Sequence, residues 1–126
     1  MKIRTNYQKL TSRLALLGLM LISLSVPAST ARIFVVSADE WAQPRSGAVI
    51  AGFDALRAAV SYWNKLDGAK ILVRYPGEDS GEFWAAELRD WLISLGVPSD
   101  SILLVAGNQA ADEIRVLVGE RNELEQ

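Results

Sequence analysis

The chain has 126 residues, with 13 lysines and arginines, 15 aspartates and glutamates, and neither histidine nor cysteine. It therefore lacks the commonest general base, the thiol nucleophile, the usual zinc ligands and any disulfide. The length suits a single domain, and a formal net charge of −2 excludes the basic surface typical of nucleic-acid binding.

The first 31 residues have the order of a cleavable secretory signal peptide. Four basic and no acidic residues precede an apolar run from Leu14 to Val26, and small residues follow Pro27. This run is shorter than the ~20 apolar residues of a spanning helix. We expect cleavage after Ala31, with Ala28 as the second choice, and a periplasmic or secreted product that keeps no membrane span.

Cleavage at this point changes the charge balance of the protein. The leader carries four of the 13 basic residues, so residues 32–126 contain nine basic and 15 acidic residues, a net charge of −6. An acidic surface of this kind is not attracted to DNA or to anionic lipid.

The mature part predicts elements in the order β-α-β-α-β-β. Strands are expected at residues 33–36, 70–75, 102–105 and 114–118, and helices at residues 48–66 and 79–95. Residues 37–47 are expected to form a loop, and residues 120–126 an acidic, flexible tail. This order predicts an α/β fold, an α+β sandwich in which two helices pack against a mixed sheet. A short link between the last two strands favours a hairpin.

Both predicted helices have apolar residues at helical spacing. The stripe of the first helix consists of Phe53, Leu56, Val60 and Trp63, and that of the second consists of Trp84, Leu88, Trp91, Leu92 and Leu95. These stripes predict core positions for three of the four tryptophans. Gly68 and Gly96 are expected as left-handed caps at the two helix ends.

Two features are candidates for binding. Glu78 and Asp79 directly follow the second strand, where carboxylates can hold a cation or an ammonium group. Asp79 also has capping-box spacing to Glu82, with Ser80 as a rival cap, and capping is the favoured interpretation. Trp41 lies in the polar first loop, and contact with a partner or glycan is weighed equally against covering the core.

Four segments resemble the OmpA-like periplasmic domain that binds peptidoglycan. Residues 55–60 (ALRAAV) and 68–73 (GAKILV) are similar to that family's first helix and second strand. Residues 90–98 (DWLISLGVP), with Ser101 and Ile102, are similar to its second helix end, its Gly-Ile/Val-Pro turn and its third strand. Residues 113–118 (EIRVLV) are similar to its closing strand. The resemblance implies one OmpA-like domain over residues 32–119.

The resemblance also implies a place for a ligand site. The family's aspartate after the second strand binds the ammonium of diaminopimelate in the wall peptide, and Glu78 or Asp79 stands there in this chain. The family's carboxylate-binding arginine, early in the second helix, is replaced by Trp84, and Arg89 lies five positions later. Arg74 is the remaining nearby cation, and it points away from the sheet face that Val73 covers.

These observations lead to two hypotheses about function. The first is a noncatalytic, secreted or periplasmic cell-envelope accessory protein with an OmpA-like fold, whose partner, an envelope protein or peptidoglycan, the sequence does not identify. The alternative is a divergent peptidoglycan-binding domain that holds the wall peptide through Glu78 and Asp79. The candidate ligand-binding residues are Glu78, Asp79, Arg74 and Trp41. No catalytic residue, metal or cofactor is expected.

Overall fold

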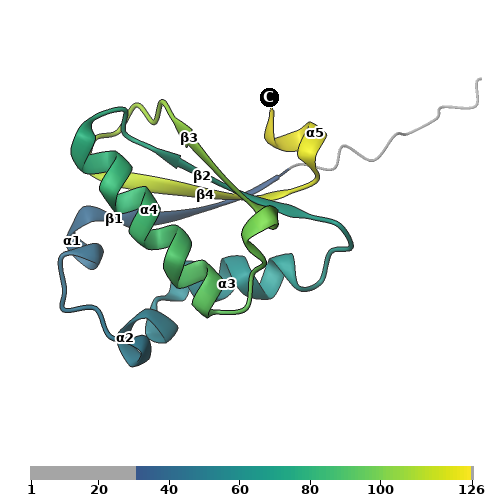
Figure 1. Cartoon of the computed structure of the whole chain (residues 1–126), viewed down its shortest axis with the longest axis horizontal. Coiled ribbons are helices and arrows are strands. Elements are labelled where there is room, and N and C mark those ends of the chain that lie inside the picture. Colours follow the sequence, from purple (N-terminus) through teal and green to yellow (C-terminus); the bar gives the residue numbers. More distant parts are fainter. Residues whose placement is uncertain (1–30, 126) are drawn as a thin grey trace, which may run out of the picture.

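The protein is described by a computed structural model that covers residues 31–125 (Figure 1). The predicted signal peptide, apart from Ala31, lies outside these residues. The elements are β1 (Arg32–Ser37), α1 (Ala38–Trp41), α2 (Gly47–Gly52), α3 (Asp54–Trp63), β2 (Lys70–Tyr75), α4 (Asp79–Ser94), η2 (Ser99–Ser101), β3 (Ile102–Ala106), β4 (Glu113–Gly119) and α5 (Arg121–Leu124). No helix among the described residues is long and apolar enough to cross a membrane.

The four strands form one mixed sheet in the order β1-β4-β2-β3, which confirms the predicted α/β class. Strand β4 runs antiparallel to both β1 and β2, whereas β2 and β3 are parallel. The predicted hairpin between the last two strands is therefore wrong. On the core face of β4, Val116 and Val118 are fully buried, and on the other face Leu117 is 8% exposed where α5 covers it, whereas Arg115 is exposed.

The link from β3 to β4 has to pass the end of β2. Gly107 takes a φ of 118°, a left-handed conformation that favours glycine, and this redirects the chain. The backbone N–H groups of Gly107 and Asn108 both donate to the carbonyl oxygen of Tyr75 at 3.0 Å. The Asn108 side chain then donates to the carbonyl of Glu113 at 2.7 Å, which ties the link to the first residue of β4.

Helices α1 to α4 cover one face of the sheet, and α5 lies on the other (Figure 1). The main core lies between α3, α4 and the sheet. The loop predicted at residues 37–47 contains α1, which begins where the Ser37 hydroxyl accepts from the Glu40 N–H at 3.2 Å. The first predicted helix is divided at Phe53 into α2 and α3. Gly96 directly follows the C-cap of α4 with the expected positive φ, at 103°. Gly68 also has a positive φ, at 70°, but it lies in the turn before β2 and is not a helix cap, because α3 already ends at Trp63.

The buried stripe of α4 differs from the predicted one. Its centre consists of Gly81, Ala85, Leu88 and Leu92. Trp84 and Trp91 are half-buried and flank this centre, although they were expected within it. Small residues occupy the first turns because the helix approaches the end of β2 closely: a Cβ atom on Gly81 would overlap the carbonyl oxygen of Pro76.

The chain end also differs from the expected flexible tail. The Glu123 carboxylate accepts from the Glu120 N–H at 2.9 Å, and this capping box begins helix α5. Leu124 is 1% exposed and packs against Leu72 and Leu117 on the sheet face that the other helices leave free. Burial of this apolar contact explains why the segment is ordered.

The close approach at Gly81 gives a prediction for stability. Gly81→Ala should destabilise the fold by about 1–3 kcal/mol, because the added methyl group forces α4 away from Pro76. Gly77→Ala is the matched control, since a Cβ there meets nothing within 4 Å and the residue has no positive φ. It should change stability by less than about 0.5 kcal/mol. Urea unfolding measures both, and equal effects would contradict the prediction.

Candidate functional site

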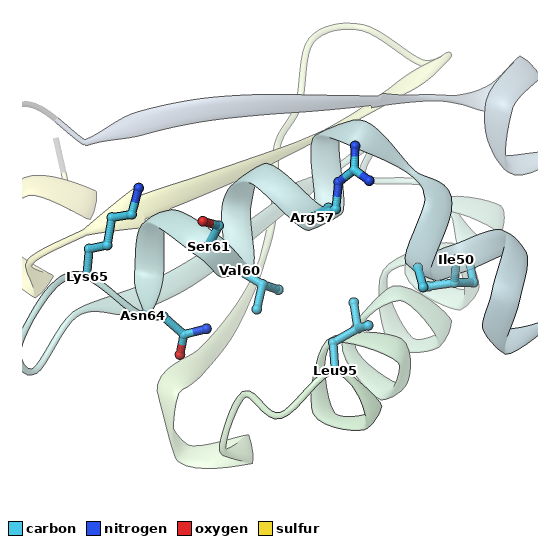
Figure 2. A pocket seen from close by; sticks show the side chains of 8 residues that line it. Ile50, Arg57, Val60, Ser61, Asn64, Lys65 and Leu95 are labelled. Atoms are coloured by element: carbon cyan, nitrogen blue, oxygen red, sulfur yellow. The ribbon is translucent and has the colours of Figure 1, made fainter.

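A cavity of about 520 Å³ lies between α2, α3 and the end of α4 (Figure 2). Its apolar lining comes from Ile50, Val60 and Leu95, which face the hollow from three elements. The volume falls within the range of small-molecule pockets. The cavity can therefore hold an apolar group.

The polar residues around this cavity do not form a catalytic arrangement. Arg57 donates to Asp54 at 2.6 Å on the exposed surface of α3. In Figure 2, Arg57 and Lys65 extend away from the hollow, and Asn64 is the polar side chain directed along it. No cluster of three acidic side chains within residues 31–125 is arranged to bind a metal ion.

The acidic turn is exposed at the start of α4. Glu78 is the N-cap residue, but its side chain makes no capping hydrogen bond, and Asp79 is already the first helical residue. The capping box predicted from Asp79 and Glu82 is therefore wrong. Instead, the Glu78 carbonyl accepts from the N–H groups of Gly81 and Glu82. The carboxylates of Asp79 and Glu82 remain in the first turn, where the helix dipole favours negative charge.

Arg74 lies on the opposite face of the sheet from α4. Val73 and Tyr75 belong to the core beneath the helices, so the alternation of the strand directs Arg74 to the other face, as predicted. Glu78 and Asp79 lie at the start of α4, which packs on the opposite face of the sheet from Arg74. The structure thus separates Arg74 from the acidic turn, and the two do not form one site.

Trp41 is buried at 6% exposure, so it is not a surface contact residue. Its ring packs against Phe53 and Trp84, with ring centroids 6.1 and 6.3 Å away. The Arg45 guanidinium lies over the ring, 5.1 Å from the centroid, and its Nε donates to Glu87 at 2.6 Å. Helix α1, which was not predicted from the sequence, directs the Trp41 side chain into the core.

The sheet face opposite α1–α4 is a second candidate surface, which we call the open face. Ser37, Lys70 and Glu113 lie towards its ends, and its centre consists of Ile33, Val35, Leu72, Arg74, Leu103, Val105, Arg115 and Leu117. Strand pairing arranges them in two rows across the sheet, Val35-Arg115-Arg74-Val105 and Ile33-Leu117-Leu72-Leu103. Helix α5 covers the middle of the second row. Ile33, Val35 and Val105 remain 56%, 44% and 38% exposed.

The open face was not predicted as a site, although part of its signal is in the sequence. Residues 33–36 are apolar without a break, so β1 has apolar side chains on both faces. A strand of this pattern is expected to be covered on both sides. Here only one side of β1 is covered by helices.

A scan against protein-family models finds no match for this chain. A search of curated proteins finds no relative either.

The burial of Trp41 can be tested by truncation. Trp41→Ala should destabilise the protein by about 3–5 kcal/mol, because it removes a ring packed against two other aromatic residues. Phe83→Ala provides the control, since Phe83 is 77% exposed, and it should cost less than about 0.5 kcal/mol. If urea unfolding shows that Trp41→Ala lowers the free energy of unfolding no more than Phe83→Ala does, the burial of Trp41 is contradicted.

Proposed function

We propose that the mature protein is a noncatalytic accessory of the cell envelope, with an OmpA-like domain, that binds another protein through the open face. The observation that carries the proposal is the exposure of Ile33, Val35 and Val105 on the part of the open face that α5 leaves uncovered. Exposed apolar side chains bordered by polar residues are typical of interaction sites.

The composition of the open face supports a protein as its partner. Apolar side chains of β1 and β3 lie at its two edges, and arginines lie in its centre. Arginine is enriched in protein interfaces, where its stem packs on apolar surface while its head forms hydrogen bonds. The cavity beside α3 has no comparable combination of charge and apolar surface directed into it.

Export is supported by the sequence order of the leader and fits the start of the fold. Strand β1 begins at Arg32, so cleavage after Ala31 removes no residue of the sheet. Ala31 itself packs against the cluster of Leu72, Leu117 and Leu124, and cleavage after Ala28 would retain this contact.

The first prediction of this proposal concerns export. The protein recovered from the periplasm or the medium should begin at Arg32, or at Ser29 if the second cleavage position is used. Mass spectrometry of the intact exported protein measures this. Recovery of the chain in the membrane fraction with Met1 still attached would contradict export with cleavage.

The second prediction concerns the open face. A photo-crosslinking phenylalanine derivative at Val35 or Val105 should form a covalent product with the same partner protein in cells, because both positions lie in one row of this face. The derivative at Ser61, which is exposed on α3, is the matched control and should form none. Products from all three positions alike, or from none, would overturn the proposed function.

The third prediction concerns the alternative, wall-peptide binding. A zwitterionic diaminopimelate head needs an acid for its ammonium and a cation for its carboxylate. Glu78 and Asp79 provide the first, but Arg74 lies on the other face, and Trp84 is half-buried against Trp41. Loss of one charge-assisted contact costs about 2–5 kcal/mol, which weakens a micromolar ligand to about millimolar.

Calorimetric titration of the mature domain with a diaminopimelate-containing peptide measures this affinity. We expect a dissociation constant near or above about 1 mM. Asp79→Ala is the informative variant, and Asp67→Ala, an exposed acid in another loop, is its control. A low-micromolar affinity that Asp79→Ala removes and Asp67→Ala preserves would restore the wall-binding function.

A further inference from the structure

Two arginines lie directly opposite each other at the centre of the open face. Arg74 of β2 is the register partner of Arg115 of β4. Directly opposed residues of antiparallel strands have Cα atoms about 4.5–5.5 Å apart. Like charges at such positions destabilise a sheet. The pair therefore works against the stability of the isolated domain.

The described residues neutralise this pair incompletely. Arg115 Nε donates to the Glu113 carboxylate at 2.8 Å, and both side chains are partly exposed. The Arg74 side chain is half-buried and makes no hydrogen bond or ion pair with any residue in the range 31–125. Lys70, on the same face of β2, differs in that its ammonium donates to the Asp100 carbonyl. Arg74 thus has a full set of guanidinium donors without an acceptor.

The pair has apolar neighbours on three sides, and Glu113 lies on the fourth. Val35 and Val105 occupy the two ends of the row that contains the arginines, and the neighbouring row contains only apolar side chains. An acceptor bound at the centre would be shielded from water by these side chains. Shielding strengthens a charge-assisted hydrogen bond, because the effective dielectric constant falls.

We propose that Arg74 and Arg115 bind one carboxylate side chain that a partner protein presents within an apolar surface. This inference rests on the proposed function and names the chemistry of its partner. A carboxylate has two acceptor oxygens, so it can accept from both guanidinium groups and relieve their repulsion. The apolar side chains around it would pack against Val35, Val105 and Ile33.

The charges of the face argue against other occupants. A second copy that packs with the same face would bring four guanidinium groups together. An anionic membrane or a strongly acidic segment would meet Glu113 and the acidic N-terminal turn of α5, on a mature chain of net charge −6. A single carboxylate in an apolar surface avoids both kinds of repulsion.

The first test needs no knowledge of the partner. Arg74→Glu places a carboxylate opposite Arg115, so we expect a higher urea midpoint than in the wild-type mature protein. Arg57→Glu is the control of opposite sign, because it replaces an ion pair with Asp54 by a repulsion and should lower the midpoint. A lower midpoint for Arg74→Glu would contradict the premise that the charge repulsion between Arg74 and Arg115 is uncompensated in the isolated protein.

The second test uses the crosslinking derivative at Val35 in the full chain in cells. The Arg74→Glu background should reduce the crosslinked product at least about tenfold, whereas Arg57→Glu should leave it unchanged. Full product with Arg74→Glu would overturn the carboxylate inference but leave the proposed function standing. Absence of product in the wild-type background would instead overturn the proposed function. A product made of two copies of this chain would also overturn the inference.

The third test uses two blocked peptides, acetyl-Val-Glu-Val-amide and acetyl-Val-Gln-Val-amide. NMR should show the Nε–H signals of Arg74 and Arg115 shifting with the glutamate peptide at least about ten times more strongly than with the glutamine peptide. The Nε–H signal of Arg57 serves as the internal control and should not move. Equal responses to both peptides, or no response to either, would overturn the inference.

Discussion

The insertion of β4 between β1 and β2 is the arrangement on which the rest of the structure depends. It joins β1 to β2 through a strand that runs antiparallel to both, so the first β-α-β unit is split and the sheet is mixed. It places Ile114, Val116 and Val118 of β4 in the centre of the core face, where they are fully buried. It also leaves β1 and β3 as the two edges of the sheet.

The same insertion brings the two arginines together. Arg74 and Arg115 are 41 positions apart in the chain, and they become neighbours only because β4 lies beside β2. If β4 paired with β3 as a hairpin, Arg115 would not lie beside Arg74. The repulsive pair is thus a consequence of the topology that gives β4 its burial, and a partner's carboxylate would offset the repulsion.

The helix layer is shaped by a different constraint, the close approach of α4 to the end of β2. Gly81 and Ala85 allow this approach, and the bulky tryptophans are therefore displaced to the flanks of the helix. There Trp84 meets Trp41, which α1 turns inward. This packing places Trp41 in the core, and the open face is the surface where charged and apolar side chains lie together.

The sequence by itself determined the α/β class, the four strands and the end of the second long helix at Gly96. These features are local: the period of the apolar residues distinguishes a strand from a helix, and a positive φ favours glycine. Periodicity also directed Arg74 away from the face that Val73 covers. The predicted end of the second strand also placed Glu78 and Asp79 directly after it. The sequence did not show that the Glu78 side chain makes no capping hydrogen bond.

Only the tertiary structure decided which strands are neighbours, and with that the composition of the open face. An apolar pattern states that a strand is buried, but it does not state which partner buries it, because several pairings satisfy the same pattern. The burial of Trp41 and Leu124 has the same origin, since each depends on contacts with residues distant in the sequence. The opposition of Arg74 and Arg115 likewise required the register of two strands that no local signal specifies.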